Sequence, residues 1–114
     1  MASESERARV VLSTIRDVAS ATELARTLVE RRLVACVNVI GSVTSVYRWR
    51  GSVEQASEAL LVMKTDERRV GELEAALREL HPYDVPEFVV LRPEHVEAKY
   101  ACWLIEETAT DAGA

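Results

Sequence analysis

The stretch Val43-Thr44-Ser45-Val46-Tyr47-Arg48-Trp49-Arg50-Gly51 decides the fold, because β-branched and aromatic residues run into a tight turn signal. Strand-like sequence also precedes it over residues 34–41 and follows it over residues 53–64. We therefore predict one long hairpin that turns at Arg50-Gly51, with Gly41 as a bulge inside the first arm. Arms of about a dozen residues, at roughly 3.3 Å per residue, make a hairpin on the order of 40 Å long. Its tip should project beyond the core of so small a domain.

One strand and one helix are expected on the N-terminal side of the hairpin. Residues 9–15 are rich in Val, Leu and Ile and predict a strand. The segment Ser20-Ala21-Thr22-Glu23 has a capping-box pattern, in which the serine and glutamate side chains bond the free amides of a helix start. Apolar residues follow at helical spacing, so the helix should run to about Arg32 and bury one face.

A helix, a strand and a last helix are expected after the hairpin. Asp66 can cap the first of these, whose apolar stripe consists of Val70, Leu73, Leu77 and Leu80. Residues 88–91 predict a strand that Pro93 ends. The last helix should begin near Glu94 and present Val96, Tyr100, Trp103 and Leu104 at helical spacing.

This order of elements predicts an α+β fold of the ferredoxin-like, split βαβ type, β-α-β-β-α-β plus a C-terminal helix, with one antiparallel sheet. The first two helices should share one face of that sheet. The strands are nevertheless apolar on both sides, as Val10 and Leu12 show beside Val11 and Ile15. A sheet covered on one face only should alternate apolar with polar residues. We therefore expect other copies of the chain to cover the second face.

Composition and charge indicate one small domain. The 114 residues, 48% hydrophobic and 29% charged, suffice for one core, which we place at residues 9–108. We expect residues 1–8 to be disordered and residues 109–114 to form a flexible tail. A net charge of -5 without a basic run argues against a nucleic-acid partner. Because the sequence has no signal-peptide core and no apolar run of membrane-spanning length, we expect a cytoplasmic protein without a membrane partner.

The two cysteines, Cys36 and Cys102, are too few for a disulfide framework and lie among apolar neighbours, where a packed free thiol is the usual outcome. An enzyme that used either thiol with His81 would need an exposed, electropositive cysteine. Neither sequence setting offers one. We therefore expect no enzymatic activity and no required cofactor.

The segment His81-Pro82-Tyr83-Asp84-Val85-Pro86-Glu87, here called the proline loop, should be rigid. Each proline fixes its own φ and removes a backbone donor, so neither a helix nor a paired strand can run through the segment. Rigid loops often present functional side chains at defined positions. Two interpretations stay open at this point: a stiff junction between a helix and a strand, and a binding site.

Several motifs together resemble those of the CutA family, the divalent-cation tolerance proteins. They are Leu33-Val34-Ala35-Cys36-Val37-Asn38, Tyr47-Arg48-Trp49-Arg50-Gly51, Met63-Lys64-Thr65, the proline loop and Tyr100-Ala101-Cys102-Trp103-Leu104. The resemblance covers about Val10 to Trp103. It implies a very stable homotrimer of ferredoxin-like subunits that is similar in architecture to the PII nitrogen-regulatory proteins. It also implies a role in tolerance of copper and other divalent metals, without an established enzymatic activity.

The resemblance carries a metal hypothesis as well. Relatives with a proposed copper site have a cysteine in the first strand and two adjacent histidines at the start of the proline loop. The matching positions here hold Ser13, Leu80 and His81, of which only His81 is a good copper ligand. Asp84, Glu87 or a second subunit would have to complete a site for copper or another divalent ion. The alternative is that His81 bonds a backbone carbonyl and shapes the helix exit.

A second candidate site is an intersubunit cleft. In a trimer, residues of the hairpin, the third strand and the proline loop could converge there, namely Lys64, Tyr83, Glu87, Tyr47, Trp49 and Cys36. A cation, a carboxylate and aromatic walls are the usual composition of a small-ligand pocket. The PII-like architecture favours a regulatory ligand by analogy only, and no glycine-rich phosphate loop is present. The alternative is a structural Lys64–Glu87 ion pair, with the aromatic residues anchoring the interface.

Overall fold

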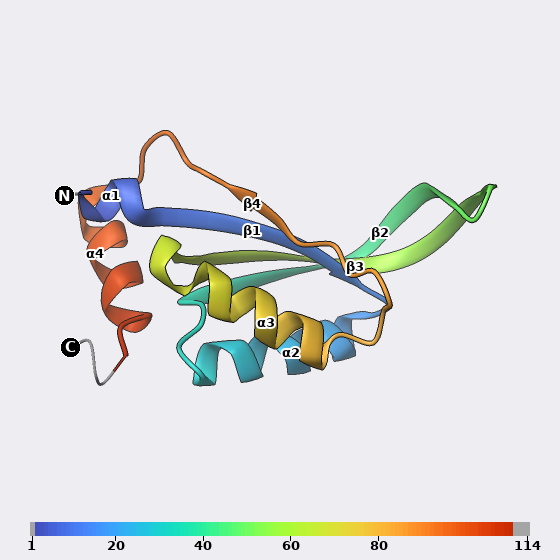
Figure 1. Cartoon of the computed structure of the whole chain (residues 1–114), viewed down its shortest axis with the longest axis horizontal. Helices are drawn as coiled ribbons and strands as arrows, with labels where there is room; N and C mark the ends of the chain where they lie inside the picture. Colours follow the sequence, from blue (N-terminus) through green and yellow to red (C-terminus); the bar gives the residue numbers. More distant parts are fainter. Residues whose placement is uncertain (1, 111–114) are drawn as a thin grey trace.

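A computed structural model describes residues 2–110, in which four strands form one antiparallel sheet packed against helices (Figure 1). The strands β1 (Ala8–Ile15), β2 (Cys36–Trp49), β3 (Ser52–Asp66) and β4 (Val89–Leu91) follow the order β2-β3-β1-β4. The helices are α1 (Glu4–Arg7), α2 (Val18–Glu30), the 3-10 helix η1 (Glu67–Arg69), α3 (Val70–Leu80) and α4 (Ala98–Glu107). The predicted α+β, ferredoxin-like split βαβ fold is confirmed.

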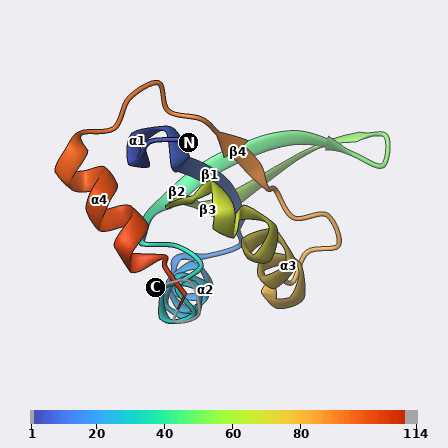
Figure 2. The same ribbon diagram turned by 60° about the vertical axis from the view of Figure 1, so that its left-hand side comes forward.

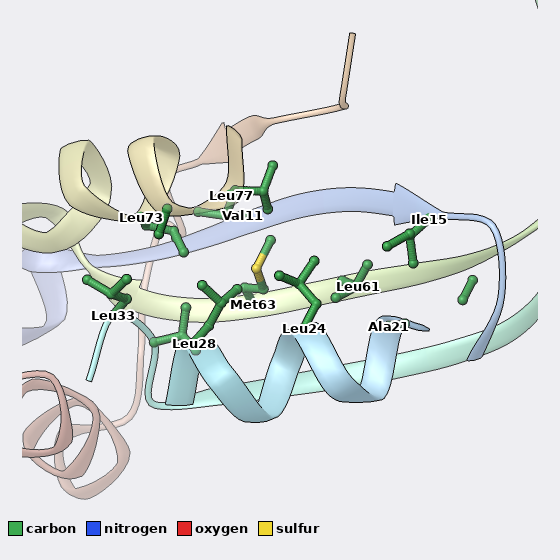
Figure 3. Packing of buried hydrophobic residues seen from close by; sticks show 13 residues of the cluster. Val11, Ile15, Ala21, Leu24, Leu28, Leu33, Leu61, Met63, Leu73 and Leu77 are labelled. Atoms are coloured by element: carbon green, nitrogen blue, oxygen red, sulfur yellow. The ribbon is translucent and has the colours of Figure 1, made fainter. Parts of the chain in front are cut away.

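The core lies between the sheet and the helices α2 and α3, which cover the same face (Figure 1). Figure 3 shows Leu24 and Leu28 of α2 and Leu73 and Leu77 of α3 directed at Val11, Leu61 and Met63 of the strands. All seven of these side chains are at most 6% exposed. Burying a side chain of this size stabilises the fold by roughly 1.5–3 kcal/mol.

The other face of the sheet, here called the open face, is also apolar, as predicted. Cross-strand pairs place Val10 beside Leu91, Leu12 beside Val89 and Val62, and Ile40 beside Leu60. Side chains alternate along a strand, so these residues point away from α2 and α3. Ile40, Val89 and Leu91 are 47%, 44% and 46% exposed in the isolated chain.

The hairpin of β2 and β3 extends beyond the helices, as predicted (Figures 1 and 2). The register shifts between Ile40 and Val43, which confirms a bulge around Gly41. Arg50 and Gly51 close the turn with φ of 50° and 83°. Positive φ at both central residues is what a tight two-residue hairpin turn requires. The tip is exposed and gives the domain a long axis of 46 Å against 27 and 22 Å.

The start of α2 differs from the prediction. Asp17, not Ser20, caps the helix, because the Asp17 carboxylate accepts a 2.7 Å hydrogen bond from the backbone N–H of Ser20. The same bond lowers the pKa of Asp17. Ser20 therefore lies within the first turn, and the predicted capping box is wrong. An aspartate two residues after the end of β1 is an equally good cap that comes three residues before Ser20.

Both ends of the described chain also differ from expectation. The last helix begins at Ala98 rather than near Glu94, with Glu97 as its cap, accepting from the backbone N–H of Tyr100 at 3.0 Å. Residues 4–7, expected to be disordered, form α1, which a capping box between Ser3 and Glu6 starts. Of the expected tail, residues 111–114 lie outside the described part. The expected domain limits of 9–108 stay a prediction.

Candidate functional site

His81 ties the proline loop to the sheet. Its backbone N–H donates to the Leu77 carbonyl at the end of α3, and its side chain is 6% exposed. The ring atom Nδ1 accepts a 3.1 Å hydrogen bond from the backbone N–H of Tyr83. The proton is therefore on Nε2, which donates to the carbonyl of Thr14 in β1 at 2.8 Å. A neutral imidazole thus joins the helix exit, β1 and the loop.

Tyr83 joins the loop to the hairpin. Its hydroxyl donates a 2.8 Å hydrogen bond to Oε2 of Glu58 in β3. The rings of Tyr83 and His81 meet edge to face, with 4.6 Å between their centres. Glu58 is only 8% exposed despite its charge. Burial, followed by the hydrogen bond to Glu58, raises the pKa of Tyr83 to about 12. The phenol therefore keeps its proton to a higher pH than an ordinary tyrosine does.

A cleft of about 630 Å³ opens between the loop and the hairpin, where the loop passes the base of the hairpin (Figure 1). Its lining consists of Thr14, Ser45, Val46, Tyr47, Trp49, Glu58 and the loop residues 83–87. Cross-strand pairs place Tyr47 and Trp49 on the same side of the hairpin as Glu58. Each wall therefore combines aromatic and acidic side chains, with Glu58 on the hairpin and Tyr83, Asp84 and Glu87 on the loop. The volume lies within the range of small-molecule sites.

The sequence matches the model of the CutA1 divalent ion tolerance protein family over residues 9–107. This chain belongs to that family. The divalent-cation tolerance protein CutA of Thermus thermophilus is 42% identical over 99 residues, which is 87% of this chain and 96% of that protein. Protein CutA of Mus musculus is 40% identical over 95 residues, or 82% of this chain. This chain covers 54% of the mouse protein, about half its length.

Solved structures of CutA proteins agree with the fold. That of the Thermus thermophilus protein superposes with a TM-score of 0.87 at 41% identity, covering 90% of this chain and 99% of that one. A structure described as the periplasmic divalent cation tolerance protein CutA from Archaeoglobus fulgidus gives 0.86 at 25% identity, covering 89% and 98%. Neither the family description nor these names denote an enzyme.

The three positions that match the proposed copper ligands of CutA relatives do not form a ligand set in this chain. Ser13 is fully buried on the helix-covered side of β1, and Leu80 offers no donor. Both nitrogens of His81 are engaged by backbone groups. Among residues 2–110, no group of three or more His, Cys, Asp or Glu side chains could hold a metal ion. The geometry of His81 is that of the structural alternative, a histidine that shapes the helix exit.

The structure brings four of the six predicted cleft residues together and leaves two elsewhere. Tyr47, Trp49, Tyr83 and Glu87 line the cleft. Lys64 and Cys36 are instead opposite each other across β2 and β3, level with Val10 of β1. At about 3.3 Å per residue, Val10 is about 13 Å along β1 from Thr14 at the cleft.

Lys64 donates to the side-chain oxygen of Asn38, and no Lys64–Glu87 ion pair forms within the described chain. Within one subunit, the cleft is therefore acidic and aromatic, without the predicted cation. The cleft between subunits, with Lys64 as its cation, and the alternative Lys64–Glu87 ion pair both stay predictions.

The thiols do not form a reactive pair with His81. Cys36 lies beside Lys64, at the far end of the sheet from His81. The Cys102 thiol donates to Glu106 at 3.4 Å, and this bond raises its pKa. A raised pKa lowers the thiolate fraction on which cysteine nucleophilicity depends.

Glu58 is the cleft residue that sequence reasoning missed. It precedes the apolar run Ala59-Leu60-Leu61 and looks like one more polar position of a solvated hairpin. Only the register beyond the bulge shows that it lies on the same side as Tyr47 and beneath Tyr83. A carboxylate at the boundary between a hairpin ribbon and a buried strand is the signal that could have identified it.

Proposed function

We propose that this CutA1-family protein acts in divalent-cation tolerance as a homotrimer whose subunits bury the open face of the sheet. Family membership supports the tolerance role. The apolar open face is the observation that supports assembly, because Ile40, Val89 and Leu91 would otherwise leave an apolar patch in water. Pairing of sheets around a symmetry axis covers such a face with identical copies.

A mass measurement by size-exclusion chromatography with light scattering tests the assembly. The variant Leu91→Glu places a charge on the open face and should lose the trimer. Val29→Glu is the matched control, because Val29 is 42% exposed on α2, on the opposite side of the sheet. We expect a trimer for the parent and the control. A monomeric parent, or a trimeric Leu91→Glu variant, would contradict the proposed interface.

The tolerance role is tested by growth on copper(II) salts. A bacterium that lacks its own family member is complemented with the parent, with Leu91→Glu or with Val29→Glu, at matched expression. We expect the parent and Val29→Glu to restore growth and Leu91→Glu to fail. Restored growth with all three proteins would show that tolerance does not depend on assembly.

Copper binding is the finer part of this proposal. Binding at His81 requires the imidazole to release one of its two hydrogen bonds, and a second subunit or Asp84 and Glu87 to supply further donors. Calorimetric titration with copper(II) compares His81→Ala with His95→Ala, which removes an exposed imidazole. Saturable binding that only His81→Ala abolishes supports the site. If the parent binds no copper(II), or if His81→Ala binds it as well as the parent does, tolerance would depend on another property of the trimer.

A second candidate function is the binding of a small regulatory ligand in the cleft, without a metal role. The cleft of about 630 Å³ and its aromatic wall favour it. Thermal-shift screening against small molecules of positive, negative and zero charge tests it. A ligand that stabilises the parent but not a Tyr47→Ala variant supports binding in the cleft, and a screen without any such ligand counts against it.

We also propose a cytoplasmic location. Cys36 and Cys102 are free thiols in the part of the chain that the structure describes, which suits a reducing compartment. No helix among residues 2–110 is long and apolar enough to cross a membrane. Fractionation of expressing cells tests the location, and recovery in the periplasm, as in the name of the Archaeoglobus relative, would overturn it.

A further inference from the structure

The cleft between the hairpin and the proline loop contains more negative charge than the chain itself neutralises. Glu58, Asp84 and Glu87 line it, and the lining as described contains no lysine, arginine or histidine. None of these three carboxylates forms an ion pair within residues 2–110. The cation whose charge acts on Tyr83 is Arg16, which pairs with Asp17 at 3.4 Å.

Glu58 is the most buried of the three carboxylates. It is 92% buried, since 8% of its surface is exposed, and it lines the cleft. Its Oε2 accepts from Tyr83, whereas no hydrogen bond within the described chain reaches its Oε1. A neutral phenol supplies a hydrogen bond without compensating charge. A buried carboxylate is stabilised chiefly by a cation that also donates hydrogen bonds.

The hairpin wall, on which Glu58 also lies, has the chemistry that attracts an organic cation. Tyr47 and Trp49 are two residues apart on one side of β2, and 44% and 39% of their surfaces are exposed. Aromatic faces attract ammonium and guanidinium groups through the negative potential of the ring. The guanidinium of Arg50 already lies 5.3 Å from the centre of the Trp49 ring. An inorganic ion would gain little from these rings and finds no ligand set among the described residues.

We propose that the cleft binds an organic amine or guanidinium compound, whose cationic groups lie near the carboxylates of Glu58, Asp84 and Glu87 and against the rings of Tyr47 and Trp49. This rests on the second candidate function, since it names the ligand class for that site. Three carboxylates favour a ligand with two or more positive charges. A cleft of about 630 Å³ accommodates a chain longer than a single ammonium ion.

The test is calorimetric titration of the parent with spermidine and agmatine, and with 1,8-octanediol and succinate as neutral and anionic probes, at constant ionic strength. The variant Asp84→Asn/Glu87→Gln removes two exposed charges from the cleft. The matched control Glu30→Gln/Glu79→Gln removes two exposed charges elsewhere and gives the same net charge. We expect the cleft variant to bind spermidine about tenfold more weakly for each removed charge that pairs with the ligand, and the control to bind as the parent does.

A third variant addresses the buried carboxylate. Glu58→Gln keeps an acceptor for the Tyr83 hydroxyl, so a folded variant that no longer binds isolates the charge of Glu58. If Glu58→Gln does not fold, Tyr47→Leu tests the aromatic wall instead, with loss of binding expected there too.

The outcomes separate the ligand class from the ligand function. Equal weakening in the cleft and control variants would reduce the effect to overall charge attraction and overturn the proposal. Tight succinate or octanediol binding that Tyr47→Leu abolishes would keep a ligand-binding function and refute the cationic class. Absence of binding by all four probes would refute the class, and together with a negative thermal-shift screen it would refute the ligand-binding function. A basic side chain of a neighbouring copy in the cleft would then account for its charge.

Discussion

Tyr83 and Glu58, 25 residues apart in the sequence, are joined by a 2.8 Å hydrogen bond that holds the proline loop against the hairpin. The pKa of Tyr83 is about 12 in the folded chain, against an ordinary value near 10. Between these two values the unfolded chain loses the phenolic proton and the folded chain keeps it. Burial of the neutral phenol, and secondarily its bond to Glu58, therefore gives a contribution to stability that is fully present below about pH 10 and is lost as the pH rises to about 12.

The raised pKa of Tyr83 predicts how stability should fall at high pH. Urea unfolding at a series of pH values should show the parent losing more stability between about pH 10 and pH 12 than Tyr83→Phe, which lacks the ionisable group. All measurements use one subunit concentration, because assembly contributes to stability. Parallel profiles for the two proteins would show that Tyr83 does not titrate in the predicted way.

Gly41 and Val18 are predicted to be coupled. A Cβ at Gly41 would lie 2.7 Å from Cγ2 of Val18, a stiff β-branched side chain. Gly41→Ala should therefore lower the free energy of unfolding by about 1–3 kcal/mol through overpacking. In a Val18→Ala background the same substitution should cost much less, since the clashing methyl is gone. A double-mutant cycle in urea measures this coupling, and simple additivity would reject the contact as the cause.

Arg32 is predicted to be worse than glycine at its position. Leu33 and Arg32 donate back to the carbonyls of Leu28 and Val29, closing α2 with a residue at φ of 58°. A side chain at positive φ costs about 1 kcal/mol, so Arg32→Gly should raise the free energy of unfolding by about that amount. Arg32→Ala, which also removes the side-chain hydrogen bond to the Glu107 carbonyl, is the control and should give no such gain. Equal stability of the two variants would count against the backbone explanation.

Ser13 is predicted to be a site where a hydroxyl destabilises the core. Its Oγ is fully buried and lacks a hydrogen-bond partner in the described chain. Ser13→Ala should therefore raise the free energy of unfolding by about 1–2 kcal/mol. Thr65→Val is the contrasting variant, because the Thr65 hydroxyl donates to the Leu33 carbonyl at 2.7 Å and its loss should destabilise. Chemical denaturation of both variants decides between these opposite signs.

Arg7 is predicted to matter more than its neighbour Arg9. Arg7 pairs with Asp66, whose side chain is 5% exposed, whereas Arg9 pairs with the more open Glu67. Arg7→Ala would leave a buried carboxylate without its cation and should cost about 3 kcal/mol or more. Arg9→Ala should cost less than Arg7→Ala, because Glu67 is 40% exposed and water can solvate its carboxylate when the arginine is removed. Similar losses for both variants in a thermal or urea melt would contradict this difference.

The hairpin and the order of elements could be predicted because the signals are local. The density of β-branched residues around Val43, the Arg50-Gly51 turn and the break at Gly41 each depend on neighbours in sequence. Helix starts were ambiguous, since Asp17 and Ser20 are both good caps and only the end of β1 decides between them. The last helix shows the same ambiguity. Its predicted start was near Glu94, but it begins at Ala98, where Glu97 supplies the cap.

The cleft could be predicted in part. Tyr47, Trp49, Tyr83 and Glu87 were identifiable as chemically distinctive residues near a turn or a rigid loop. Their partner Glu58 depends on the strand register beyond the bulge, which no local pattern specifies. Lys64 and Cys36 are distinctive as well, yet the register pairs them with each other at the far end of the sheet.

The bulge at Gly41 divides the hairpin into a part backed by the core and a free two-stranded ribbon. On that ribbon Val46 and Val53 are 63% and 67% exposed, and Tyr47 and Trp49 form one wall of the cleft. A ribbon of two strands is marginally stable alone in water, so its amides in a lone subunit should exchange hydrogen for deuterium almost freely. Neighbouring subunits that hold the ribbon would slow this exchange and fix the width of the cleft. If a ligand favours that fixed width, assembly strengthens the binding of the ligand. By linkage, the ligand then strengthens the assembly by the same factor.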